Sequence, residues 1–338
     1  MNRRAILFAA LPAILLGGTI ALQAQNSVTN VGHIPTAGEV HGVALMGHFL
    51  YTAEGSAGLH VYDVSNPSNV ISLASTNPGG TAWSVAVASN CLCLANLDDG
   101  LRTYDISNPS NLVALGHTNN GGLAVSVTVA GHYAYLANDR DGLRIYDLTN
   151  PSIPTNVGHG LNPNTQDGLA YNVAVSGNFA YVANAHDGIR VYDIANPSNP
   201  LAIGYVSDLT NTLAFSSGVS VSSNYLYVAN NSDGLRIFDI TNPASPTNVY
   251  WNIINNTVAD AIGITVTNGF AFVADYFTSL RVYNLSNPTN MVLVSYPTSF
   301  MGTYDTTRAF PEFTVVTTNS AYVAFHRDGV RIYSFSPP

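Results

Sequence analysis

The chain has 338 residues, of which only 9% are charged, and its 11 Lys and Arg residues oppose 20 Asp and Glu, giving a net charge of −9. This acidic balance argues against nucleic acid or an anionic membrane surface as a partner, because both attract basic protein surfaces. Since charged residues are so few, we expect Asn, Ser and Thr in the loops to keep the surface hydrated.

The first 24 residues have the composition of a secretory signal peptide. Two arginines precede an apolar stretch from Ala5 to Leu22, and Ala24 provides a small residue for cleavage. An uncleaved membrane anchor is the alternative, because a stretch of this length can span a bilayer, but Pro12 weakens it. We therefore expect residues 1–24 to be removed. Residues 25–338 would form the mature chain, which is secreted, periplasmic or on the cell surface and is not inserted in a membrane.

One motif recurs seven times along the mature chain. In its clearest copy, Tyr135-Leu-Ala-Asn138 is followed by Asp141-Gly-Leu-Arg-Ile-Tyr-Asp147 and then by Asn150-Pro151. The other copies begin at Tyr51, Cys93, Tyr181, Tyr227, Phe272 and Tyr322. A period of about 40 to 50 residues with four strand-like runs per copy is typical of β-propeller blades.

Within this copy the four strands follow one another in chain order. We expect them at Val125–Val129, Tyr133–Ala137 and Leu143–Leu148, with Val157–His159 in the fourth. Gly131, Asp141-Gly142 and Asn150-Pro151 punctuate the runs as turns. The first strands of the copies carry small residues and the later strands carry large ones, as expected of sheets that crowd around an axis and spread outward.

The two ends of the mature chain indicate how the ring closes. The chain begins with Val28-Thr-Asn-Val-Gly-His33, which matches the fourth-strand sequence Thr155–His159. It ends with the third-strand sequence Gly329–Tyr333 and no fourth strand after it. The sequence therefore predicts an all-β fold, a single seven-bladed β-propeller of four-stranded antiparallel blades in which the N-terminal strand completes the last blade.

The repeated block Gly-Leu-Arg-(Ile/Val)-Tyr-Asp, followed by Asn-Pro, resembles the LVIVD-repeat family of extracellular β-propellers. Tyr-Val-Ala-Asn at positions 181 and 227 is more distantly similar to the YVTN-type propellers of surface proteins. The resemblance spans residues 28–338 and implies a cell-surface or secreted location. It implies no catalytic residues. Tyr or Phe replaces the second hydrophobic residue of the LVIVD core, a departure that we expect to affect packing more than fold.

The polar residues that recur in most copies are expected to be architectural. An Arg such as Arg144 recurs in the third strand, with Asp141 before it in the hairpin and Asp147 three residues after it. Seven equivalent ion sites are the alternative. A residue required in every blade is more simply explained if the hairpin Asp supports its turn, the strand-end Asp accepts backbone hydrogen bonds and the Arg reaches a carboxylate or a carbonyl.

The remaining reactive side chains predict no catalytic residues, no metal site and no cofactor. The His residues do not cluster in the sequence, and no pair has the spacing of a zinc motif. The loop Asn138–Gly142 resembles part of a calcium loop, but Ala137 stands at the first ligand position. Cys91 and Cys93, two residues apart on one face of a strand, are expected to be buried free thiols.

Variation among the seven copies indicates a binding face. The loops before the first strands and the second hairpins share one face of a propeller, and the second column of the first strand varies freely there. It reads His41, Trp83, Val125, Tyr171, Ser217, Ile262 and Glu312. Loops on a rigid frame commonly carry function. The candidate binding residues on this face are Trp83, Asp167, Tyr171, Asp260, Arg308 and Glu312.

These observations favour a monomeric binding module that recognises a protein or a glycan at the cell envelope. Two alternatives stay open. A carbohydrate-active enzyme would use carboxylates at the channel mouth, such as Asp167, Asp260 and Glu312. A purely structural envelope protein would need none of the residues on this face.

Overall fold

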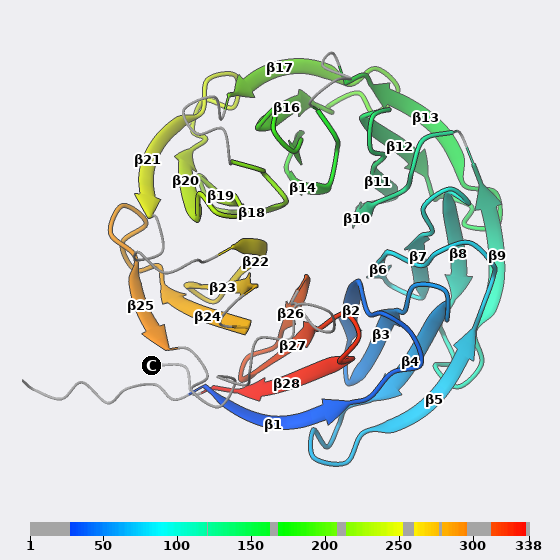
Figure 1. Ribbon diagram of the computed structural model, residues 1–338. Helices are drawn as coiled ribbons and strands as arrows, with labels where there is room; N and C mark the ends of the chain where they lie inside the picture. Colours follow the sequence, from blue (N-terminus) through cyan, green and yellow to red (C-terminus); the bar gives the residue numbers. More distant parts are fainter. Residues whose placement is uncertain are drawn as a thin grey trace, which may run out of the picture.

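The computed structural model describes residues 28–119, 121–162, 168–207, 214–252, 260–276, 279–295 and 312–335. These residues form seven four-stranded antiparallel sheets arranged as the blades of a ring (Figure 1). The all-β, seven-bladed propeller predicted from the repeat is therefore confirmed. The expected signal peptide at residues 1–24 lies outside the described residues. Within the described ranges there is no helix, and hence none with the length and hydropathy to cross a membrane.

Each blade runs from an inner strand near the axis to an outer strand at the rim (Figure 1). The inner strands are β2 (Gly42–Met46), β6 (Ser84–Ala88), β10 (Ser126–Ala130), β14 (Asn172–Ser176), β18 (Gly218–Ser222), β22 (Ala261–Thr267) and β26 (Thr314–Val316). The second strands are β3 (Phe49–Ala53), β7 (Cys91–Ala95), β11 (Tyr133–Ala137), β15 (Phe179–Ala183), β19 (Tyr225–Ala229), β23 (Phe270–Asp275) and β27 (Ser320–Ala324). The third strands are β4 (Leu59–Asp63), β8 (Leu101–Asp105), β12 (Leu143–Asp147), β16 (Ile189–Asp193), β20 (Leu235–Asp239), β24 (Ser279–Asn284) and β28 (Val330–Ser334). The outer strands are β5 (Ile71–Thr76), β9 (Val113–Thr118), β13 (Thr155–Gly160), β17 (Leu201–Val206), β21 (Thr247–Asn252), β25 (Val292–Ser295) and β1 (Thr29–Ile34).

The hydrophobic core is divided among the contacts between neighbouring blades. In one cluster, Cys93 and Leu101 of the second blade pack with Leu136 and Tyr146 of the third. The strands between the inner and the outer ones are covered on both sides, so their apolar residues occupy both faces. Of the two thiols expected to be buried, Cys93 is fully buried. Cys91 is only half-buried. It is the first residue of β7, and the first residue of the second strand is partly exposed in the next blade too.

The ring closes between the two ends of the chain, as the sequence predicts. β1 pairs antiparallel with β28, with Thr29 opposite Ser334 and Ile34 opposite Val330, and Figure 1 shows the two strands side by side. Ile34 and Val330 are also buried in one cluster that reaches Tyr62 of the first blade. The N-terminal strand therefore completes the last blade and removes the edge that β28 would otherwise expose.

Glycines in the outer strands allow the blades to approach each other closely. β12 and β13 shift register between Ile145 and Tyr146, beside Gly158. A Cβ atom on Gly158 would lie 2.0 Å from the carbonyl oxygen of Pro197, in the Asn-Pro turn of the next blade. In the same way, a Cβ atom on Gly32 would lie 2.1 Å from the carbonyl oxygen of Pro67. The Asn-Pro turn therefore also serves as a packing surface for the preceding blade.

The repeated charged residues have the architectural contacts expected of them. Arg144 Nε donates to Asp141 Oδ2 at 2.5 Å, and the Nδ2 of Asn138 donates to the same oxygen at 2.8 Å. The strand-end carboxylate of Asp147 accepts a hydrogen bond from the backbone N–H of Thr149 at 2.7 Å. The neighbouring blades repeat both arrangements: Arg102 contacts Asp99, and the carboxylate of Asp105 accepts from the backbone N–H of Ser107.

Among the described residues, backbone bridges join the second hairpins of six blades to the segment that leads into the next blade. These pairs are Val40 with His326, Gly55 with Ala82, Leu97 with Ala124, Asp139 with Ala170, Ala185 with Ser216 and Asn231 with Ala261. The two kinds of loop therefore share one face of the disc, as predicted, and we call it the mouth face. The bridge between Val40 and His326 links the last blade to the first.

Candidate functional site

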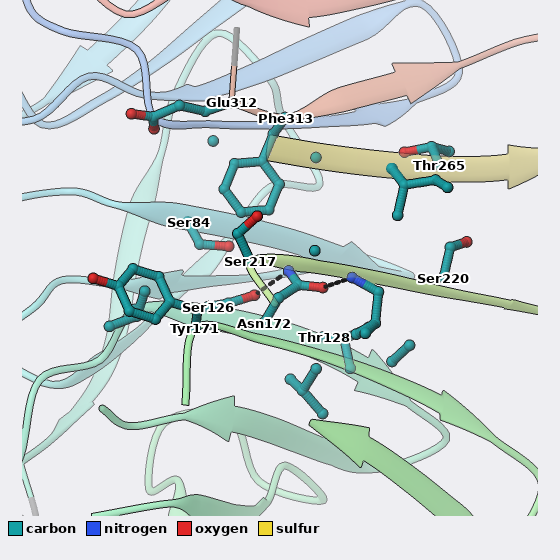
Figure 2. Close-up of a pocket in the computed structure, with 18 of the residues that line it drawn as sticks. Ser84, Ser126, Thr128, Tyr171, Asn172, Ser217, Ser220, Thr265, Glu312 and Phe313 are labelled. Carbon is teal, nitrogen blue, oxygen red and sulfur yellow. Dashed lines mark hydrogen bonds between the residues drawn. The ribbon is translucent and has the colours of Figure 1, made fainter. Parts of the chain in front are cut away.

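The axial channel is a cavity of about 510 Å³ that opens on the mouth face and is lined mainly by the inner strands (Figure 2). Small apolar and hydroxyl residues alternate along its wall, among them Val85, Ser126, Thr128 and Ser220. Figure 2 shows Glu312 and Tyr171 toward one end of the channel and Thr265 and Ser220 toward the other. The space at the axis is therefore neutral and polar over most of its length.

Several polar groups in the wall also tie adjacent blades together. Asn172 donates from Nδ2 to Ser126 Oγ at 3.1 Å, and its Oδ1 accepts from the backbone N–H of Val219 at 3.1 Å (Figure 2). Ser220 Oγ likewise accepts from the N–H of Val266 at 3.1 Å. These contacts link neighbouring inner strands around the channel.

Aromatic rings gather around the mouth of the channel. Trp83, Tyr171, Phe215 and Phe313 all line the cavity and are half-buried. Tyr171 and Phe215 meet edge to face with ring centroids 5.0 Å apart, and His186 contacts Phe215 at the same distance. Rings packed in this way present partly exposed apolar surface in fixed orientations.

A buried pair, His41 and Glu312, lies beside these rings. His41 Nδ1 is 2.9 Å from Glu312 Oε2, and the two residues are 2% and 9% exposed. Trp83 stacks on the His41 ring, with centroids 3.8 Å apart and planes 11° from parallel. Burial raises the pKa of the Glu312 carboxyl, although the hydrogen bond with His41 opposes this.

A second cavity of about 430 Å³ lies next to the mouth and shares Trp83 with the channel. Glu39, His41 and Arg327 line it. Glu39 Oε1 accepts from Arg327 Nε at 2.5 Å, and Glu39 Oε2 lies 3.1 Å from His326 Nε2. The hydrogen bond from Arg327 lowers the pKa of Glu39, while burial lowers the pKa of His326.

The His residues are scattered in the sequence, but His41 and His326 come together in space. The His41 and His326 rings are 5.1 Å apart, and donor atoms of Glu39, His41 and His326 all lie within 4.8 Å of one another. In the described part of the chain, this is the group of His, Cys, Asp and Glu side chains that could hold a metal ion. Sequence spacing does not reveal it because ring closure brings position 326 to position 41.

Three of the predicted site residues, Trp83, Tyr171 and Glu312, lie together at the channel. Asp260 lies before β22 and next to Asp275, and burial together with the charge of Asp275 raises its pKa. Asp260 is not among the described residues of the channel wall. Asp167 and Arg308 fall outside the described residues.

No pattern in the sequence selects Glu39 or His326 as a site residue. The sequence places His41 only in the variable column, which also contains Trp83 and Glu312, and both of these contact His41 in the structure. His326 is in the varying part of the last hairpin, next to Arg327.

Comparisons with known proteins agree with this architecture. The profile of the LVIVD repeat matches residues 37–77, 79–119, 121–160, 167–208, 216–250 and 259–306. Among solved structures, the crystal structure of the computationally designed Ika8 protein is similar, with a TM-score of 0.64 and 6% sequence identity over 91% of this chain and 99% of the designed one. At this identity the similarity concerns the fold alone. No curated protein matches the chain. Because the repeat segments cover more than half of its residues, the chain belongs to the LVIVD repeat family.

Proposed function

We propose that this propeller is an exported interaction module that binds a glycan at the mouth of its axial channel. One observation carries the proposal: half-buried rings from different blades, Trp83, Tyr171 and Phe215, border a cavity whose wall carries neutral polar groups among small apolar ones. Sugars offer apolar ring faces together with hydroxyl groups. Aromatic side chains with hydroxyl and amide groups nearby suit both features.

The proposed location follows from the leader and the family. A signal peptide over residues 1–24 would deliver residues 25–338 to the periplasm, the cell surface or the medium. The absence of Lys and the excess of acidic residues suit a neutral ligand better than an anionic one. We propose that the mature chain acts there as a monomer, because the ring needs no second chain to pair β1 and β28.

Binding is favoured over glycoside hydrolysis by the positions of the carboxylates. Hydrolysis normally needs two carboxyl groups, about 5 to 9.5 Å apart, on either side of the scissile bond. Among the described residues that line the channel, Glu312 is the one carboxylate, and it is hydrogen-bonded to His41. Asp260, the other candidate that the structure describes, lies beside Asp275.

The test uses the fact that the chain has two Trp residues. Trp251 is on the outer strand β21, so Trp251→Phe leaves Trp83 at the mouth as the single Trp fluorophore. We expect envelope glycans to change the emission of this variant saturably. We expect Tyr171→Ala in the same background to weaken binding at least tenfold.

Trp251→Ala, tested by calorimetry, is the matched control at the rim and should leave affinity unchanged. If the chain captures an envelope protein but its fluorescence does not respond to any glycan, the protein-binding alternative is favoured. Release of sugar from chromogenic glycosides, abolished by Glu312→Gln, would establish an enzyme. If no ligand of either class responds to changes at Trp83 or Tyr171, the structural role stands instead.

A further inference from the structure

We propose that Glu39, His41 and His326 bind a divalent transition-metal ion of the Zn²⁺ class where the last blade meets the first. The proposal does not rest on glycan binding, because Glu39 and His41 line the second cavity and none of the three residues lines the axial channel. Two imidazoles and one carboxylate are a ligand set that Zn²⁺ accepts, with a further position left for water or a ligand.

The donor atoms are close to the spacing that a metal requires. Bonds of about 2 Å in a tetrahedral arrangement place neighbouring ligand atoms about 3.3 Å apart. Glu39 Oε2 is 3.1 Å from His326 Nε2 and 3.9 Å from His41 Nε2. The three donor atoms lie within 4.8 Å of one another, so closing the widest gap to about 3.3 Å would bring all three to a common centre.

The orientation of His41 is the second, independent indication. His41 presents its Nδ1 to Glu312 Oε2 at 2.9 Å. Its other ring nitrogen, Nε2, is therefore the one directed toward the Glu39 carboxylate, 3.9 Å from Oε2. A buried carboxylate behind a metal-binding imidazole is also the usual way in which such a ring is oriented.

The surroundings hold the ligands and leave room for an ion. Trp83 fixes the plane of His41 by stacking on it. Gly55 stands at a position where other hairpins carry side chains such as Leu97, and a Cβ atom there would be in ordinary van der Waals contact with His41 Nε2, at 3.6 Å. Arg327 binds the Oε1 of Glu39, so Oε2 remains directed at the two rings. The second cavity connects this cluster with the surface, so an ion has a path to it.

The experiment uses the tag-free full chain, with Cys91→Ala as background so that the half-buried thiol does not compete for metal. After treatment with a chelator, Zn²⁺ is titrated by calorimetry and Co²⁺ by visible absorption. We expect one saturable equivalent, with cobalt bands typical of nitrogen and oxygen ligands. His326→Ala and Glu39→Gln should each lower the affinity at least 100-fold. Glu312→Gln retains all three ligands and should lower it about 10- to 100-fold.

His117→Ala is the matched control, because His117 lies near Asp99 in another blade and is outside the cluster. It should bind Zn²⁺ with wild-type affinity. Circular dichroism tests whether each variant is folded. If His326→Ala does not fold, the conservative variant Glu39→Gln still tests the site. The proposal is overturned if the folded parent protein shows no saturable equivalent, or if folded Glu39→Gln and His326→Ala bind as tightly as the parent.

Discussion

His41 and Glu312 are separated by 271 positions in the chain, yet His41 Nδ1 and Glu312 Oε2 form a buried hydrogen bond of 2.9 Å. One residue precedes the first inner strand and the other precedes the last. Their contact therefore depends on closure of the ring and on nothing local. It also places an ionisable pair between the channel and the second cavity.

Removing one member of this pair should destabilise the protein strongly. His41→Ala leaves the Glu312 carboxyl buried without its partner, which should cost about 3 kcal/mol of unfolding free energy. Glu312→Gln retains a polar acceptor and should cost about 1 kcal/mol. Urea unfolding measures both values, with His117→Ala as an exposed control within about 0.5 kcal/mol of the wild type. An equally small effect for His41→Ala would contradict the structural role of the pair.

Gly158→Ala should be among the most damaging single-methyl additions in the molecule. Its Cβ would lie 2.0 Å from the Pro197 carbonyl oxygen, and backbone on both sides limits relaxation. We expect a loss of about 3 kcal/mol, at the upper end for overpacking. Thermal unfolding gives the measurement. The control is Ala74→Gly, because Ala74 occupies in the first blade the position that Gly158 occupies in the third. Ala74 is opposite Val61, as Gly158 is opposite Ile145. A melting temperature close to that of the wild type for Gly158→Ala would show that the blades can separate without cost.

The hairpin carboxylates should contribute stability that acid removes. Burial raises the pKa of Asp141, but hydrogen bonds from Arg144 and Asn138 outweigh this effect and lower the pKa. Because the folded-state pKa is below the unfolded value of about 3.9, the stabilisation is complete above that pH and is lost as the pH falls through the folded-state pKa.

Asp141→Asn should therefore cost about 2 kcal/mol at neutral pH and progressively less as acid protonates the wild-type carboxyl. Unfolding curves at a series of pH values test this, with the exposed Asp98→Asn as a comparison. A difference between wild type and Asp141→Asn that stays constant into acid would mean that the carboxylate charge has no part in holding the hairpin.

The two cysteines should react at different rates. A hydrogen bond with Cys93 lowers the pKa of Cys91, which is half-buried, whereas the same hydrogen bond and burial raise the pKa of Cys93. In the native protein, a thiol reagent should modify one equivalent, and the second should react only after unfolding. Mass spectrometry of the modified peptides identifies the residue. Rapid reaction of both thiols, or of neither, would contradict the packing of β7.

The fold could be predicted from the sequence because each blade repeats the same local signals. Asp141-Gly142 and Asn150-Pro151 mark turns in one copy, and the other copies confirm the period. The likeness of Val28–His33 to Thr155–His159 was enough to predict the closing strand. The strand bounds differed slightly, since the first strand of this blade is Ser126–Ala130 rather than Val125–Val129.

The candidate site was predictable only in part. Comparison of the copies selects Trp83, Tyr171 and Glu312, because their column varies freely from one copy to the next. Glu39 and His326 could not be found in this way. They are in loop columns where many residues are accepted, and their proximity depends on the last hairpin meeting the loop before the first inner strand.

The pairing of β1 with β28 also bears on how the chain is synthesised. β1 is the first strand of the ring to be made and its partner is the last, so β1 has no partner until synthesis is almost finished. A product that ends before β28 would leave β1 without any partner strand, and unpaired strands invite aggregation. Proteolytic quality control could therefore recognise truncated chains by an exposed β1.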